Sequence, residues 1–183
     1  SLKYMRNLIV LLLFISPFVV AEDYPACNIQ ISSIVAFTSD KARDTLVISV
    51  KGEPCYDGIL SIVITNEIGK VVYEYSSPFK QHKPVHWAEK DFDLVARKQV
   101  KRMVEGAMSN TSSLPDLPEV SLCEIPEPDC ETYEMNTVPK DEYISYRAQK
   151  LPMLNHSTHY EGWASFIYDA TKGETVKVLE GSL

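Results

Sequence analysis

The sequence predicts an α+β protein in which an antiparallel sheet is covered by one amphipathic helix and held together by two disulfides. Several stretches of the N-terminal half alternate apolar and polar residues, as strands do, and residues 91–108 have the apolar spacing of a helix. The chain also contains four cysteines. We expect about four N-terminal strands, then the helix, and then a C-terminal three-stranded region.

Residues 1–21 have the features of a secretory signal peptide. Two basic residues precede an apolar run, and Val19-Val20-Ala21 has the small-residue pattern after which a signal peptidase cuts. The run from Leu8 to Ala21 is 14 residues long, whereas a membrane-spanning helix needs about 20. We therefore expect cleavage and no stable membrane anchor. Ser1 to Tyr4 precede the expected initiator Met5 and are treated as upstream residues.

Residues 22–183 are expected to form a single exported domain, because 162 residues are enough to bury a substantial core. The leader holds two of the 18 basic residues and none of the 25 acidic ones, so the remaining chain has a formal charge of 16 − 25 = −9. Phosphate backbones and anionic lipid both attract basic surfaces. We expect neither nucleic acid nor a lipid surface as the partner.

The first two expected strands, residues 29–37 and 45–51, flank a polar turn and would form an antiparallel hairpin centred on Lys41. Cys27 and Cys55 each lie 14 residues from that centre, so the hairpin brings them within bridging distance. Exported chains oxidise such pairs, and closing this loop stabilises the fold by about 3.5 kcal/mol. Cys123 and Cys130 are left to bridge each other, which contributes about 2.5 kcal/mol.

Residues 59–65 and 70–76 are expected to form a second hairpin. Gly69 ends the four-residue turn between them, where a positive φ is needed. The first arm is apolar on both faces and is typical of a central strand.

A helix is expected from Asp91 to Met108. Its apolar residues fall on one side at spacings of three and four, and Asp91 is a suitable N-cap while Asn110 is a possible stop. An amphipathic helix must bury its apolar side. We expect it to cover one face of the sheet.

The chain from Ser109 to Pro139 is rich in proline and acidic residues and is expected to be a loop, which the small disulfide would hold in its middle. A short helix is expected over residues 140–149. Strands follow at residues 151–155, 162–168 and 175–179, the last two joined by a turn that ends at Gly173. The pattern leaves open whether these strands extend the first sheet or form a second layer.

His156 and His159, followed by Glu161, form the densest group of polar side chains. In a loop they could bind zinc or copper, with His82 and His86 as further ligands. The alternative is a polar turn between two strands. No cysteine remains to help once both disulfides form, and the spacing fits no specific metal motif, so we expect no metal or other cofactor.

No catalytic residue is assigned from the sequence. No serine lies in a Gly-x-Ser-x-Gly motif, and the glycines are not clustered as a phosphate-binding loop requires. A carboxylate pair such as Glu161 with Asp169 could be assembled, but any acidic chain offers such pairs. We expect a protein that is not an enzyme, with a small hydrolase or metal-binding protein using residues 156–161 as the alternative.

The expected helix has the only concentrated positive charge of the chain, which could bind an anion or an acidic partner. The alternatives are a solvated face or pairing with acids of the loop. The basic residues are Arg97, Lys98, Lys101 and Arg102, and the acids are Glu124, Glu127, Asp129, Glu131 and Glu134.

Tyr160 and Trp163 could add an aromatic binding surface, although core packing explains the same residues. Asn110-Thr111-Ser112 and Asn155-His156-Ser157 fit the N-glycosylation pattern, which matters only in a eukaryotic secretory route.

Taken together, these features favour an exported, disulfide-stabilised protein that acts as a non-catalytic binding or inhibitor-like module. Its partner would be another extracytoplasmic protein. The net charge alone suggests a basic secreted enzyme, such as a lysozyme, as one example.

Overall fold

The computed structural model describes residues 26–53, 55–82, 92–109 and 133–182. Several features expected from the sequence lie outside these ranges. They are the signal peptide, the helix cap Asp91, the stop Asn110, His86, and the Cys123–Cys130 pair with most of the acidic loop.

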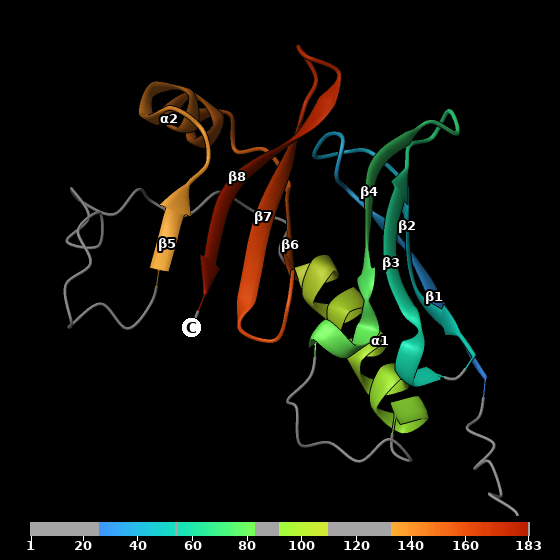
Figure 1. Cartoon of the computed structure of the whole chain (residues 1–183). Helices are drawn as coiled ribbons and strands as arrows, with labels where there is room; N and C mark the ends of the chain where they lie inside the picture. The colour runs from blue at the N-terminus through green and yellow to red at the C-terminus, as the bar shows by residue number, and fades with distance from the viewer. Residues whose placement is uncertain (1–25, 54, 83–91, 110–132, 183) are drawn as a thin grey trace, which may run out of the picture.

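Within the described ranges, two antiparallel sheets and two α-helices confirm the α+β class (Figure 1). The first sheet has the order β1-β2-β3-β4 and the second the order β5-β8-β7-β6. In the first sheet the strands are β1 (Cys27–Val35), β2 (Asp44–Gly52), β3 (Ile59–Thr65) and β4 (Val71–Pro78). In the second they are β5 (Tyr133–Asn136), β6 (Met153–Ser157), β7 (Gly162–Asp169) and β8 (Glu174–Ser182). The helices are α1 (Phe92–Ser109) and α2 (Lys140–Gln149), with short 3₁₀ turns η1 (Cys55–Asp57) and η2 (Phe79–His82).

The disulfide between Cys27 and Cys55 is present, with 4.3 Å between the two Cα atoms. Its hairpin, however, is not centred on Lys41. Cys27 pairs with Gly52 and Val35 with Asp44, which centres the hairpin between residues 39 and 40. The Asp44 carboxylate accepts hydrogen bonds from the backbone N–H groups of Phe37 and Thr38, just after β1. Cys55 is the first residue of η1.

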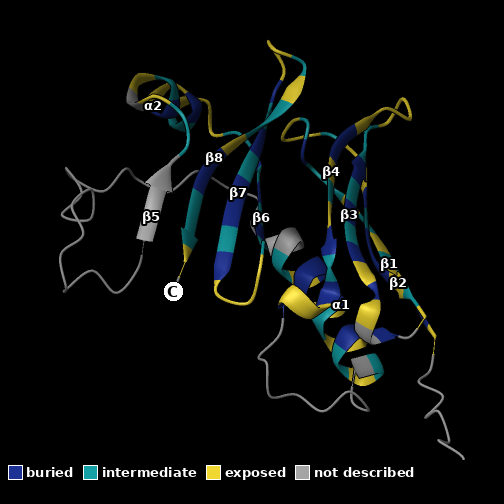
Figure 2. Cartoon of the chain, viewed as in Figure 1, coloured by how far each residue is buried: buried dark blue, intermediate teal, exposed yellow. Residues whose placement is uncertain are grey.

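The core of the first sheet lies on the face that α1 covers. Alternate residues of β2 and β3 are buried on this face, and the register places Leu46 opposite Ile64 and Ile48 opposite Ile62. Ala96, Val100, Met103 and Val104 of α1 belong to the same apolar cluster. Figure 2 shows the buried side of the helix turned toward the strands. The amphipathic helix therefore covers a sheet face, as its periodicity predicts.

The C-terminal strands form a second sheet and do not extend the first. α2 has the bounds expected from the sequence, and its Tyr143 and Tyr146 are buried with Ile167, Val178 and Leu179 of β7 and β8. The expectation that residues 109–139 form only a loop is wrong at its end, because β5 pairs with β8. Four residues are too few for an alternation pattern to reveal a strand. The strand β5 is recognised only by its pairing with β8.

Both expected glycine turns are confirmed. Gly69 has a φ of 82° at the end of the β3–β4 turn, and Gly173 has a φ of 71° before β8.

Candidate functional site

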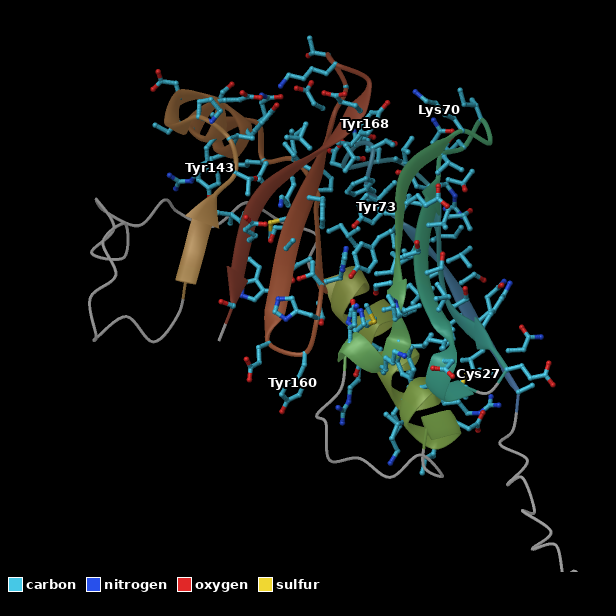
Figure 3. All side chains as sticks on the ribbon, in the orientation of Figure 1. Cys27, Lys70, Tyr73, Tyr143, Tyr160 and Tyr168 are labelled. Atoms are coloured by element: carbon cyan, nitrogen blue, oxygen red, sulfur yellow. A yellow bond between two sulfur atoms is a disulfide. The ribbon has the colours of Figure 1, made fainter. Side chains whose placement is uncertain are left out.

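The two sheets meet between β4 and β6 through tyrosine, serine and histidine side chains, which we call the inter-sheet cluster (Figure 3). Its members are Tyr73, Tyr75 and Ser77 of β4, His82 of η2, and His156 and Ser157 of β6. The β4 members alternate along the strand, so they share the face that bears the core of the first sheet. The cluster is thus the polar continuation of an apolar core.

Tyr73 and His156 form the centre of this cluster. The Tyr73 hydroxyl lies 2.5 Å from Nε2 of His156, and Nδ1 of the same ring lies 2.9 Å from the carbonyl oxygen of Ser157. A carbonyl can only accept, so Nδ1 donates and Nε2 accepts the tyrosine proton. The imidazole also stacks on Phe166, with ring centroids 5.2 Å apart. His156 therefore links β4 to the β6–β7 hairpin.

A second chain of hydrogen bonds runs through His82. The Ser157 hydroxyl donates to the carbonyl oxygen of His159 at 2.6 Å, which leaves its oxygen to accept from Nδ1 of His82 at 3.2 Å. Nε2 of His82 then accepts from the Ser77 hydroxyl at 2.6 Å. Because the His159 carbonyl can only accept, it determines which atom donates in each hydrogen bond of this series. Ser77 is thereby placed against a histidine that can accept its proton.

Burial keeps the histidines of the cluster neutral. It lowers the pKa of His82 to about 4, helped by the nearby His156 and His159, and it also lowers the pKa of His156, against the hydrogen bond to Ser157. Burial raises the pKa of Tyr73 in the same way, with a further contribution from Tyr75. The cluster is built from neutral donors and acceptors.

The protein is therefore expected to lose stability as the pH falls from about 6.5 toward 4. His82 has its ordinary pKa of 6.5 in the unfolded chain and about 4 in the fold, so in this window the unfolded state binds a proton that the folded state does not. The loss begins below 6.5 and stops growing below 4. Urea titrations across this window should show a smaller pH dependence for His82→Gln than for the wild type. Equal slopes in the two proteins would contradict the assignment.

Ser77 and His82 also have the geometry of a nucleophile and its general base, with Ser157 in the place of the group that orients the base. The two side chains belong to residues that are only 9% and 6% exposed. In the described fold their hydrogen bonds join η2 and β4 to β6. The alternation of Tyr73, Tyr75 and Ser77 along one strand is the local sequence signal from which this site could be found.

The expected metal ligands are not gathered at one point. The expectation that residues 156–161 form a loop is wrong for His156 and Ser157, which belong to β6. His156 is buried there. His159 is exposed in the turn, where its ring lies over Gly162 so closely that a side chain there would overlap it, and Glu161 is exposed. Within the described residues, no group of three or more His, Cys, Asp or Glu side chains could hold a metal ion.

The basic side chains of α1 are exposed, but only some are paired. Arg97 binds Asp93 at 3.0 Å, and Nζ of Lys101 lies 3.8 Å from Glu105. Lys98 and Arg102, one turn apart, form no ion pair with any described carboxylate. We call the four residues Arg97, Lys98, Lys101 and Arg102 the α1 basic face.

The aromatic residues do not form one surface. Tyr160 is 55% exposed in the β6–β7 turn, while Trp163 is half-buried and packs against the core beside α2. Phe166 and Tyr168 pack on the core of the first sheet. Asn155, in the second glycosylation motif, donates from Nδ2 to the Ser165 hydroxyl at 3.0 Å and lies within β6.

The carboxylate pair of Glu161 and Asp169 is also not formed, because the two residues lie at opposite ends of β7. Asp169 instead accepts from the Tyr146 hydroxyl at 2.8 Å and from the backbone of Thr171 and Lys172. Burial acts to raise the pKa of Asp169, but these hydrogen bonds outweigh it and lower the pKa. The carboxylate joins the β7–β8 turn to α2.

No protein-family model, no curated protein and no solved structure matches this chain. None of the helices in the described ranges is long and apolar enough to cross a membrane.

Proposed function

We propose that this protein is an exported, non-catalytic binding module whose partner is another extracytoplasmic protein with an acidic contact surface. The proposal depends on one observation above all. Lys98 and Arg102 project from α1 without an ion-pair partner among the described residues, in a chain whose net charge is −7. Exposed charge of this kind attracts a complementary surface and selects against others.

Burial and pairing elsewhere support the same proposal. The reactive groups of the inter-sheet cluster are bonded to one another, whereas the α1 basic face turns outward. Export is supported by the disulfide between Cys27 and Cys55, because such bonds persist in oxidising compartments. The negative charge of the rest of the molecule is screened beyond about 10 Å at moderate ionic strength, so a local positive face can act independently.

Reversing the charge of Lys98 and Arg102 is expected to abolish partner binding while leaving the fold intact. Extracytoplasmic proteins of the source organism would be passed over immobilised wild type and over the Lys98→Glu/Arg102→Glu variant, at low and at high salt. Acidic proteins should be retained only by the wild type and only at low salt. The control Lys41→Glu/Lys51→Glu has the same change of net charge at exposed sites away from α1 and should retain them.

Thermal unfolding of the Lys98→Glu/Arg102→Glu variant without any partner separates this proposal from its rival. An unchanged midpoint is expected for a face that binds another protein, since exposed charges contribute about 0–1 kcal/mol each. A midpoint well below that of the Lys41→Glu/Lys51→Glu control would mean that the basic face pairs within the chain, with the acids between Pro115 and Pro139, and would overturn the proposal.

A small hydrolase is the second candidate, and the pair of Ser77 and His82 favours it. The Ser77 hydroxyl already donates to Nε2 of His82 at 2.6 Å, as a serine nucleophile does to its base. A fluorophosphonate probe should then label the folded protein at Ser77, and His82→Gln should abolish labelling. Absence of labelling under conditions that modify a known serine hydrolase would remove this candidate.

A further inference from the structure

Each of the two sheets has an apolar cluster of its own. The cluster of the first sheet includes residues of α1, and the cluster of the second sheet includes Tyr143 and Tyr146 of α2. The two sheets lie side by side (Figure 1). From the second sheet, Leu154, Phe166 and Tyr168 reach into the first cluster. Each sheet therefore keeps most of its own core when the contact between the sheets is lost.

One group of hydrogen bonds joins the sheets at the start of β4. The Thr175 hydroxyl of β8 donates to the Val72 carbonyl at 2.5 Å, and Nζ of Lys70 donates to the Gly173 carbonyl at 3.4 Å. No histidine and no carboxylate takes part in either bond. This end of the contact between the sheets is therefore independent of histidine protonation.

The other group of hydrogen bonds runs from Tyr73 of β4 into η2 and contains the inter-sheet cluster. Tyr73 lies between the two sheets in Figure 3. Further along, the Tyr75 hydroxyl donates to the Thr158 carbonyl at 2.8 Å, and the backbone N–H of Tyr160 donates to the Gln81 carbonyl at 2.8 Å. Both buried histidines of the described chain, at positions 82 and 156, belong to this group.

The surroundings of His82 and His156 contain no compensation for a positive charge. Their hydrogen-bond partners are hydroxyl groups and one carbonyl, and His159 in the adjoining turn repels a proton on His82. Within the described ranges, no carboxylate forms an ion pair with either ring. The charged groups on the elements around the cluster are exposed or bound elsewhere: Glu74 of β4, Lys80 of η2, Glu161 of the turn, Asp169 of β7 and the charged residues of α1.

We propose that the inter-sheet cluster is an acid-operated joint: when His82 and His156 take up protons, the sheets part at η2 and the β6–β7 turn, while each sheet keeps its fold. The contact between Val72 and Thr175 remains and acts as the hinge. This inference concerns the interior of the molecule and does not depend on the binding function proposed above.

The direction of the change follows from proton linkage. In the closed arrangement, burial lowers the pKa of His82 to about 4 and also lowers the pKa of His156. Once the sheets part, water reaches both rings and each pKa returns toward its ordinary value of 6.5. Below about pH 6.5 the open arrangement therefore binds protons that the closed one does not, and its population grows as the pH falls. For His82 this growth stops near pH 4.

The backbone N–H of Tyr160 is a direct reporter, because its acceptor, the Gln81 carbonyl, lies across the joint. Amide hydrogen exchange would be followed by NMR from about pH 7 to about pH 4.5, with each rate compared with the intrinsic rate at the same pH. The protection of the Tyr160 amide should fall by up to about tenfold per pH unit for each histidine that takes up a proton. The amides of β2 and β7 should keep their protection, and the far-UV circular dichroism should not change.

Two variants make the result specific to the histidines. His82→Gln/His156→Gln keeps hydrogen-bonding groups without a titrating ring, so the protection of the Tyr160 amide should become independent of pH. If this variant does not fold, His82→Gln alone should show a smaller slope than the wild type. The control Glu161→Gln removes an exposed carboxylate from the same turn and should behave as the wild type does.

Three results would overturn the proposal. Protection of the Tyr160 amide that does not change between about pH 7 and about pH 4.5 would show that the joint stays closed. An equal loss of protection at Tyr160, β2 and β7 would mean that the protein unfolds as one unit. A slope that persists in the folded His82→Gln/His156→Gln variant would assign the effect to other groups.

Discussion

Removing the disulfide between Cys27 and Cys55 is expected to lower the free energy of unfolding by about 3.5 kcal/mol and the melting temperature by about 10 °C. The bond closes a loop with a sequence separation of 28 and joins the start of β1 to η1. Both cysteines are almost fully buried, at 3% and 2% exposure, so alanine is the replacement that leaves no buried polar group.

Urea titration of Cys27→Ala/Cys55→Ala measures the effect. The matched variant Cys123→Ala/Cys130→Ala removes the smaller ring expected from the sequence and should cost about 2.5 kcal/mol. The Cys27→Ala/Cys55→Ala variant should also release β1. The backbone amide hydrogens of residues 27–35 should then exchange with solvent faster than those of β3. A Cys27→Ala/Cys55→Ala variant as stable as the wild type would show that the first sheet does not need the bond.

The parts of the fold that were predictable are those determined by local periodicity. Alternation identified β1 to β4, and the helical spacing identified α1 and α2 to within one or two residues. The disulfide followed because a hairpin makes distant cysteines neighbours, although the pairing centre was misplaced. All nine residue pairs of β1 and β2 share the shifted register, and the Asp44 carboxylate accepts from Phe37 and Thr38 just after β1.

The candidate site was much less predictable, because it depends on the packing of one sheet on the other. His156 was expected in a loop because its neighbours are polar, yet it is buried against Tyr73 and Phe166. Both ring nitrogens of His156 have hydrogen-bond partners, Tyr73 and the Ser157 carbonyl, so the buried ring is satisfied. The contact with Tyr73 comes from the other sheet, and a local sequence pattern does not show it. The chain of Ser77, His82 and Ser157 joins residues up to 80 positions apart, so no local pattern could reveal it.

The α1 basic face was predictable as a stripe of charge but not as a set of pairs. Helical spacing places Arg97 next to Asp93 and Lys101 next to Glu105, and both pairs form. Lys98 has no acid three or four residues away, and Glu105, which is three residues after Arg102, pairs with Lys101. Lys98 and Arg102 are therefore the two cations on which the proposed binding function rests.

Replacing Asp44 with alanine is expected to lower the free energy of unfolding by about 3 kcal/mol. The residue is fully buried, and its carboxylate accepts from the backbone N–H groups of Phe37 and Thr38 at 3.1 and 2.6 Å and from the Thr38 hydroxyl at 2.9 Å. Alanine would leave these donors unpaired in the connection from β1 to β2, and buried donors without acceptors are costly.

Two further variants make this prediction specific. Asp44→Asn keeps an acceptor oxygen and should recover part of the loss, whereas Asp40→Ala removes an exposed carboxylate from the same connection and should change stability by less than about 0.5 kcal/mol. Equal effects of Asp44→Ala and Asp40→Ala in urea titrations would contradict the role of the buried carboxylate.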